Sequence, residues 1–193
     1  MAPAPVAGPP MGTAPPVNIS APRPAPSAPE ARAGDEYPDL LAQIIRTVRP
    51  RGADPSMADE AARARLRPSV EQAVRGLGNL PSGVTPDRVI HDVVTEIGGG
   101  GAIESALGDP EVTAILVDGH GRVSVARNGG ALAPSGYWFS GGSAVVECVD
   151  RWLRANGLDR AGKSTVNVTL GDGTRVLGAF APLTHQGAVV NIE

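Results

Sequence analysis

One short stretch of the chain has the residue types and spacing to bind a nucleotide phosphate. In "GLDRAGKST" (157–165), Gly157, Gly162, Lys163 and Ser164 satisfy the pattern of a P-loop, and Lys163 is the only lysine of the sequence. In a working P-loop the backbone N–H groups surround the phosphates, the lysine reaches their oxygens and the hydroxyl binds magnesium. Such a loop follows a buried strand and leads into a helix, whose N-terminus faces the anion. The flanking segments therefore decide whether the pattern is functional.

Both flanks have the wrong secondary structure for a P-loop. Apolar residues at helical spacing before the motif predict a helix over 142–156, and the alternating "TVNVTL" (165–170) predicts a strand after it. Gly157 is then the residue that ends a helix, and Gly162 and Lys163 belong to a polar loop. We therefore expect Gly157, Gly162, Lys163 and Ser164 not to bind nucleotide. A Lys163→Ala substitution should change neither stability nor nucleotide affinity.

The composition separates a tail from a globular part. Residues 1–34 hold ten of the nineteen prolines and almost no large apolar side chain, so they predict a disordered Pro/Ala-rich tail that is dispensable for folding. This tail lacks the basic start and apolar run of a signal peptide, and no stretch of the chain is apolar for long enough to span a membrane. A net charge of −3 with both signs mixed throughout argues against a nucleic-acid surface.

The few residues capable of metal or thiol chemistry are scattered. Cys148 is the single cysteine, so it forms no internal disulfide, fits a reducing cytosol, and is expected to pack on an apolar helix face. His91, His120 and His185 lie far apart, without cysteine or carboxylate companions at ligand spacing. The sequence thus gives no support for a metal site.

Residues 35–97 have a helical apolar period and predict a three-helix bundle. The first helix is expected from a cap at Asp35, and the second to run over 54–76 with a break or restart at Pro68. The third begins after Thr85, a good N-cap followed by proline. Three amphipathic helices of this length bury their apolar stripes most simply against one another.

Residues 98–193 predict a sheet domain with one main helix, which makes the chain an α+β protein. A run of four glycines, Gly98 to Gly101, leads into a short helix, and we expect it to act as a hinge between the bundle and the sheet domain. Apolar or alternating segments then predict strands at 112–117, 122–127, 165–170, 174–180 and 188–192.

This second half resembles a known family. The segments "IESALGDPEVTAILVDGHGRVSVARNGGAL" (103–132) and "VNVTLGDGTRVLGAFAPLTHQGAVVNI" (166–192) are similar to the N-terminal region of Tad-pilus motor ATPases. These motors form the CpaF/TadA branch of the type II/type IV secretion ATPase superfamily. The most specific elements are Asp-Pro-Glu-Val-Thr, Arg-Asn-Gly and Asp-Gly-Thr-Arg, and the resemblance covers roughly residues 36–193, including the helical bundle ahead of the sheet domain.

The resemblance implies an assembly and regulatory region rather than an enzyme. In the family this region precedes a RecA-like motor domain that carries the true P-loop and the catalytic residues, so we expect ATP and magnesium only where a motor domain is present. The implied partners are other subunits of a hexamer and inner-membrane platform proteins of the pilus or secretion system. The implied location is cytoplasmic and peripheral to the inner membrane, with no direct membrane insertion.

Arg175 is the candidate functional residue, and it has two interpretations. By strand alternation it points out of the core, where it is either a solvated arginine near Asp172 or, as the resemblance implies, a contact to nucleotide held on the motor domain. Glu193 departs from the family, which usually has arginine at that place, and a carboxylate repels phosphate. A stand-alone, non-hydrolytic adaptor of the same fold and a small P-loop enzyme remain as alternative functions.

Overall fold

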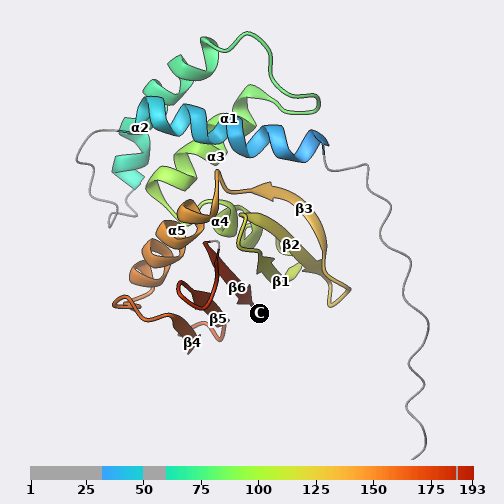
Figure 1. The fold of residues 1–193 in the computed structure, drawn as a ribbon, viewed down its shortest axis with the longest axis vertical. Helices are drawn as coiled ribbons and strands as arrows, with labels where there is room; N and C mark the ends of the chain where they lie inside the picture. Colours follow the sequence, from blue (N-terminus) through green and yellow to red (C-terminus); the bar gives the residue numbers. More distant parts are fainter. Residues whose placement is uncertain (1–31, 50–59, 186) are drawn as a thin grey trace, which may run out of the picture.

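The computed structural model describes residues 32–49, 60–185 and 187–193. Three helices come first: α1 (Arg32–Val48), α2 (Glu60–Arg75) and α3 (Pro86–Gly98). The short α4 (Ala102–Leu107) leads to strands β1 (Val112–Val117), β2 (Arg122–Arg127) and β3 (Ala133–Trp138). Helix α5 (Gly142–Ala155) follows, and then β4 (Thr165–Thr169), β5 (Arg175–Phe180) and β6 (Ala188–Ile192). The chain is thus an α+β protein, with the helices α1–α3 above the sheet in Figure 1.

The strands form one antiparallel sheet in the order β3-β2-β1-β6-β5-β4. Its central pairing joins β1 to β6, with Ile115 opposite Ile192, so the last strand of the chain closes the middle of the sheet. Helices α4 and α5 contribute to the core on one face, where Val145, Cys148 and Val149 of α5 are fully buried. The opposite face carries the outward residues of each strand.

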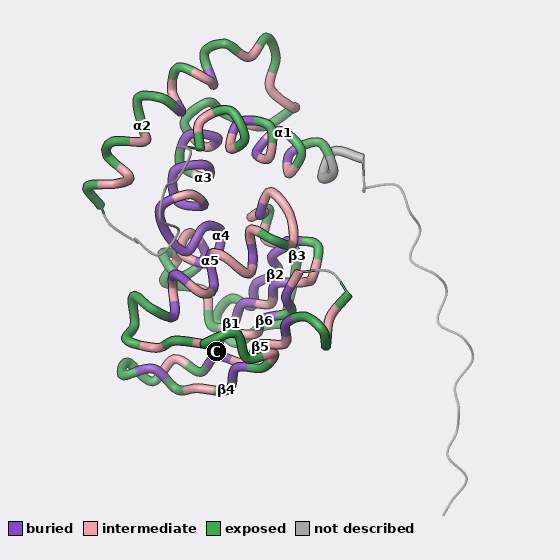
Figure 2. The backbone as a smooth tube through the Cα atoms, turned by 60° about the vertical axis from the view of Figure 1, so that its left-hand side comes forward, coloured by how far each residue is buried: buried purple, intermediate pink, exposed green. Residues whose placement is uncertain are grey.

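Helices α1, α2 and α3, called the bundle below, have a hydrophobic core of their own. Leu41 of α1, Val70 of α2 and Val89 and Val93 of α3 are fully or almost fully buried together. Figure 2 shows α3 as the most buried of the three helices and α2 as largely exposed. The predicted cap of α3 is confirmed, because the Thr85 hydroxyl accepts a hydrogen bond from the Arg88 N–H (3.3 Å) and proline follows at the first helical position.

The first two helices differ from their predicted bounds. Helix α1 begins at Arg32 and passes through Asp35, so Asp35 is not the cap and the globular part starts earlier than expected. Helix α2 continues through Pro68 without a break. Pro68 and Ala64, whose carbonyl loses its donor, are both exposed, so water can satisfy that carbonyl. Residues 1–31 of the predicted tail (1–34) and the predicted helix start near Asp54 lie outside the described residues.

The five predicted strands are present within one residue of their expected bounds, and the structure adds β3. This strand reads "APSGYW" and contains proline and glycine, so it lacks the alternation by which the other strands are recognised. Its pairing with β2 is irregular between Arg122 and Ser124. Trp138 at its end packs against the bundle core, which links the two parts of the molecule.

Candidate functional site

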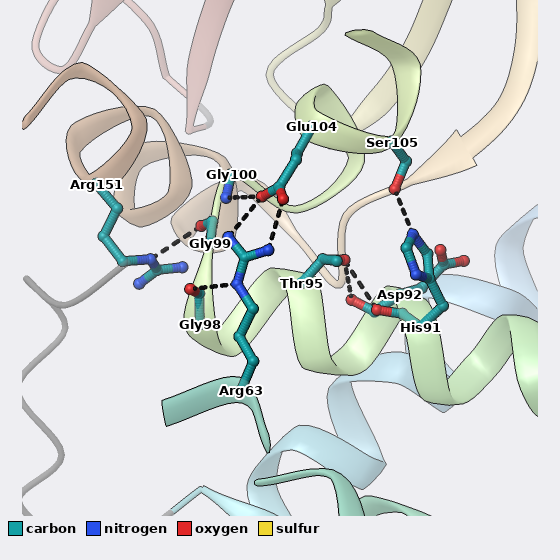
Figure 3. Close-up of polar contacts among 10 residues, drawn as sticks. All are labelled: Arg63, His91, Asp92, Thr95, Gly98, Gly99, Gly100, Glu104, Ser105 and Arg151. Carbon is teal, nitrogen blue, oxygen red and sulfur yellow. Dashed lines mark hydrogen bonds and ion pairs between the residues drawn. The ribbon is translucent and has the colours of Figure 1, made fainter. Parts of the chain in front are cut away.

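The bundle and the sheet domain meet at a joint formed by the end of α3, the four glycines and the facing surfaces of α2, α4 and α5. Figure 3 shows its polar contacts. Arg63 of α2 donates from Nη1 and Nη2 to the two carboxylate oxygens of Glu104 on α4, at 2.6 and 2.9 Å. Its Nε donates to the Gly98 carbonyl at 3.0 Å. One side chain thereby connects α2, the end of α3 and α4.

The glycines of the joint are buried and closely packed. A Cβ on Gly98 would lie 2.8 Å from Arg63 Cγ, and one on Gly99 would lie 2.5 Å from Glu104 Oε2. Gly101 adopts a positive φ of 58°, and a Cβ there would lie 2.7 Å from Phe139 Cε1. These glycines therefore allow side chains and backbone to approach closely, which argues against the hinge predicted for Gly98–Gly101.

Helix α5 contributes a buried arginine to the joint. Arg151 is only 1% exposed, and its Nε donates to the Gly99 carbonyl at 3.0 Å. Its Nη2 donates to the Glu96 carbonyl and lies 3.1 Å from the Cys148 sulfur. A positive charge at the carboxyl end of α3 satisfies the terminal carbonyls and complements the helix dipole. Arg151 thus fixes the main helix of the sheet domain to the end of the bundle.

A buried carboxylate lies beside these contacts. Glu96 is 5% exposed and accepts hydrogen bonds from the Ser140 N–H (2.9 Å) and from the Ser140 hydroxyl, just before α5. Burial raises the pKa of Glu96 to about 7, although the two hydrogen bonds from Ser140 and the charge of Arg151 act in the opposite direction. The ionisation of Glu96 is therefore coupled to the contact between α3 and the start of α5.

Further contacts connect the two parts at the periphery of the joint. Arg49 pairs with Glu147 of α5 at 2.6 Å, and the Arg88 guanidinium donates to the Gly136 carbonyl of β3. A cleft of about 270 Å³ lies beside the first of these pairs, and Glu96 and Ser140 also line it. The bundle and the sheet domain are consequently docked on both sides of the glycine run.

Cys148 packs as predicted. It is completely buried, its sulfur donates to the Glu96 carbonyl at 3.4 Å, and burial raises the pKa of its thiol. Within the described ranges, no cluster of three or more His, Cys, Asp or Glu side chains is placed to hold a metal ion. None of the helices in that part of the chain is long and apolar enough to cross a membrane.

The P-loop-like residues lie in the connection between α5 and β4, in the order helix, loop, strand. Gly157 (φ 76°) ends α5: its N–H donates to the Arg154 carbonyl, and the Leu158 N–H donates to the Leu153 carbonyl. This is the Schellman arrangement, with Leu158 packed against the core. The helix-before, strand-after order predicted from the sequence is therefore confirmed, and β4 begins directly after Ser164.

Arg160 of the same loop bonds to α5 and to the loop backbone. Arg160 forms two hydrogen bonds with the Asp150 carboxylate, at 2.7 and 2.8 Å, and lies 4.1 Å from the centroid of the Phe180 ring. Its Nη1 donates to the Lys163 carbonyl at 2.5 Å, and the Lys163 N–H donates back to the Arg160 carbonyl at 3.0 Å. The Lys163 amide is thus engaged within the loop, unlike the free amides of a phosphate cradle.

Arg175 lies at the start of β5 on the open face of the sheet, exposed as expected from alternation. Its N–H and C=O bond to the C=O and N–H of Glu193, at 2.7 and 2.9 Å, so the two residues are direct cross-strand neighbours. Asp172 instead accepts a hydrogen bond from the Thr174 N–H, and the described residues contain no ion pair between Asp172 and Arg175. Arg175 therefore lies at the start of a strand, whereas the P-loop-like residues lie in a separate loop.

The joint residues were not identified as functional from the sequence. Two of them, Glu96 and Arg151, could have been identified from the sequence. Glu96 lies on the apolar stripe of α3, three residues after Val93. Arg151 lies on the apolar stripe of α5, three residues after Cys148. A charged residue at a core position signals a buried polar contact. The partners Arg63 and Glu104 carry no comparable signal, because both lie among other charged or small residues.

No protein-family model matches the chain, and no curated protein matches it. Among solved structures, part of the chain is similar to the VirB11 ATPase from the Brucella suis type IV secretion system, solved in complex with sulphate. That similarity has 19% sequence identity and a TM-score of 0.38, over 48% of this chain and 29% of that ATPase chain. The chain therefore spans well under half of the length of this neighbour.

Proposed function

We propose that this chain is the N-terminal assembly and regulatory region of a pilus or secretion motor ATPase, and that it does not hydrolyse ATP by itself. The observation that carries the proposal is the packed joint, in which Arg63, Glu104 and Arg151 fix the bundle to the sheet domain. A region that passes a change of position from a motor to its neighbours needs such a connection, since a free hinge would absorb the movement. The resemblance of segments 103–132 and 166–192 to Tad-pilus motors supports the same role.

In this proposal the chemistry belongs to a motor domain of the parent protein. ATP and magnesium would bind there, and the parent would assemble as a hexamer. It would lie in the cytoplasm and bind the platform proteins of the inner membrane. The regulatory group of the present chain is Arg175, whose guanidinium is always charged and exposed on the sheet. It would contact a phosphate through two parallel hydrogen bonds and stabilise the charge that develops on hydrolysis.

One observation favours a second function, a stand-alone, non-hydrolytic adaptor of the same fold. Glu193 lies directly opposite Arg175 in the β5–β6 pair. Directly opposite residues project to the same face of a sheet, so the carboxylate offsets part of the positive charge that a phosphate would meet. An adaptor would use this face for protein contacts only.

The experiment compares Arg175→Ala with Arg154→Ala in the parent protein carrying its motor domain. Arg154 is an exposed arginine in the last turn of α5, so it controls for the loss of one surface charge. A charge-assisted hydrogen bond to phosphate contributes about 1.5–3 kcal/mol, so Arg175→Ala should lower ATP turnover by a factor of about 10 or more while Arg154→Ala leaves it unchanged. Equal turnover in both variants, with normal folding and assembly, would remove Arg175 from the mechanism and favour the adaptor.

A further inference from the structure

Strand β4 forms an open margin of the sheet. It pairs with β5 on one side, and no strand of residues 32–49, 60–185 or 187–193 lies on its other side. Figure 1 shows β4 at the lower margin of the molecule, and Figure 2 shows it at the same margin from another direction. A sheet edge of this kind presents unpaired N–H and C=O groups that can bond to another strand.

The groups that face this edge can be identified from the neighbouring hydrogen bonds. The Ser164 carbonyl accepts from Phe180 N–H at 2.9 Å, and the Leu170 N–H donates to the Thr174 carbonyl at 2.8 Å, both toward β5. Because bonding direction alternates along an antiparallel strand, the odd-numbered residues between them direct their backbone groups away from β5. These are Thr165, Asn167 and Thr169, and all three are exposed.

Among the described residues, the β4 margin is the one without the usual protection against pairing. Natural edge strands carry charges or proline, or are covered by another element. At the other margin, β3 contains Pro134, and the bundle covers it through Trp138 and through the hydrogen bond from Arg88 to Gly136. The sequence of β4, "TVNVT", contains neither charge nor proline.

The occupant of this edge follows from the order of residues in β4, which reads the same in both directions. We propose that two copies of this chain pair β4 against β4, antiparallel, about a two-fold axis at Asn167, and so form one continuous sheet. In this register Thr165 lies opposite Thr169 of the second copy, Val166 opposite Val168, and Asn167 opposite Asn167. The interface is isologous, as a closed dimer requires, and it goes beyond the function proposed above.

The bonding direction of β4 agrees with this axis. A two-fold at Asn167 pairs Thr165, Asn167 and Thr169 of one copy with Thr169, Asn167 and Thr165 of the other. These are the residues whose N–H and C=O groups point away from β5, and each such pair exchanges two hydrogen bonds. An axis at Val166 or Val168 would instead bring together groups that already bond to β5.

Side chains on the core face also match. Val168 is half-buried at the margin of the core in a single copy, and Val166 is almost fully buried beside it. In the dimer Val168 lies directly beside Val166 of the second copy, on the face that carries α5. Pairing thus extends the apolar core across the two-fold axis and covers Val168.

Charges beyond the strand are complementary in the same register. Lys163 lies opposite Gly171 of the second copy, next to Asp172, and the two-fold repeats this contact on the other side. Both Lys163 and Asp172 are exposed. The only lysine of the chain would therefore meet a carboxylate of the second copy, which gives the P-loop-like segment a role in pairing.

The register can be tested by disulfide cross-linking of the full chain. Residues facing each other in a hydrogen-bonded antiparallel pair have Cα atoms about 5.5 Å apart, within reach of a disulfide. Asn167→Cys should therefore give a covalent dimer on mild oxidation. Thr165→Cys is the matched control, because its two copies would lie four residues apart along the strand, about 14 Å, and should not cross-link. The native Cys148 is fully buried and does not compete.

Sedimentation equilibrium provides the second measurement. The wild-type chain should show a reversible monomer–dimer equilibrium with a dissociation constant between about 1 µM and 1 mM, as expected for a small interface. Asn167→Pro removes a free edge N–H, which an edge strand tolerates, so it should abolish dimers without lowering the melting temperature by more than a few degrees. Leu177→Lys changes the sheet face one strand inward and should leave the dimer intact.

Several results would overturn the proposal. A wild-type chain that stays monomeric at millimolar concentration would do so, as would equal cross-linking of the Asn167→Cys and Thr165→Cys variants. Dimers that persist in Asn167→Pro, or that disappear only in Leu177→Lys, would place the contact on another surface.

Discussion

Glu96, the buried carboxylate at the joint, is expected to destabilise the folded chain when it is ionised. Its neutral analogue, Glu96→Gln, retains the shape of the side chain and both contacts with Ser140. The amide oxygen can accept from the Ser140 N–H, and the amide nitrogen can donate to the Ser140 hydroxyl oxygen, because a hydroxyl both donates and accepts. The substitution therefore removes the charge without leaving a buried polar group unsatisfied.

The direction and size of the effect follow from the pKa of Glu96. In the folded chain it is raised from 4.5 to about 7, chiefly by burial, so the folded state holds a proton that the unfolded state releases between these two values. The free energy of unfolding therefore falls as pH rises through this window, because the folded state binds more protons there. A shift of this size corresponds to at most about 3 kcal/mol, fully expressed above pH 7 and absent below pH 4.5.

The assay is urea unfolding of wild type and Glu96→Gln at pH 5 and pH 8. We expect the variant to be nearly as stable as wild type at pH 5 and more stable by up to about 3 kcal/mol at pH 8. Glu147→Gln serves as the control for the loss of one carboxylate, since its side chain is 39% exposed. If Glu96→Gln were destabilising at pH 8 and its pH profile ran parallel to that of wild type, the ionised carboxylate would be stabilising, which is opposite to the expected effect of its burial.

Gly101→Ala should lower the free energy of unfolding by about 2–4 kcal/mol, since the new Cβ combines a positive φ with overlap against Phe139. Gly83 also has a positive φ but faces open space, so Gly83→Ala should lower the free energy of unfolding by only about 1 kcal/mol. Urea unfolding measures both, and equal losses would show that the joint has room. NMR relaxation should give one rotational correlation time for residues 60–107 and 112–180, because the bundle and the sheet are docked; two distinct times would restore the hinge. Lys163→Ala should leave the melting temperature unchanged within the effect of a surface substitution, about 0.5 kcal/mol, and calorimetry with Mg-ATP should detect no binding in either protein. Micromolar binding that is lost in the variant would identify the loop as a nucleotide site.

The elements with strong periodicity could be predicted from the sequence. Helix α3 has a five-residue apolar stripe with a Thr-Pro start, and β1 is a continuous apolar run, so local preference and core packing favour the same structure. The start of α1 was predicted too far along the chain, because Asp35 followed by Pro38 is typical of a helix start. The helix instead begins at Arg32 and passes through both residues. Strand β3 has no such pattern and is held by β2 and the bundle, which the sequence does not show locally.

The candidate site was harder to predict because its residues meet across long distances in the chain. Arg63 and Glu104 lie 41 residues apart, and only the folded bundle brings them together. The glycine run was ambiguous, since the same absence of Cβ permits either a hinge or close packing. Which of these applies depends on the neighbours, and these are Arg63 of α2, Glu104 of α4 and Phe139 in the segment after β3. Arg175 could be placed correctly because strand alternation alone determines its face.

The proposed role as assembly region of a motor ATPase requires a motor domain in the same polypeptide. The most direct test is to purify the native protein from its source cells with an antibody against residues 60–193, and to determine its mass, its peptides and its ATPase activity. We predict a polypeptide longer than 193 residues that contains a RecA-like domain with a strand-first P-loop and that hydrolyses ATP. A polypeptide of 193 residues with no ATPase activity and no motor subunit bound to it would contradict the claim.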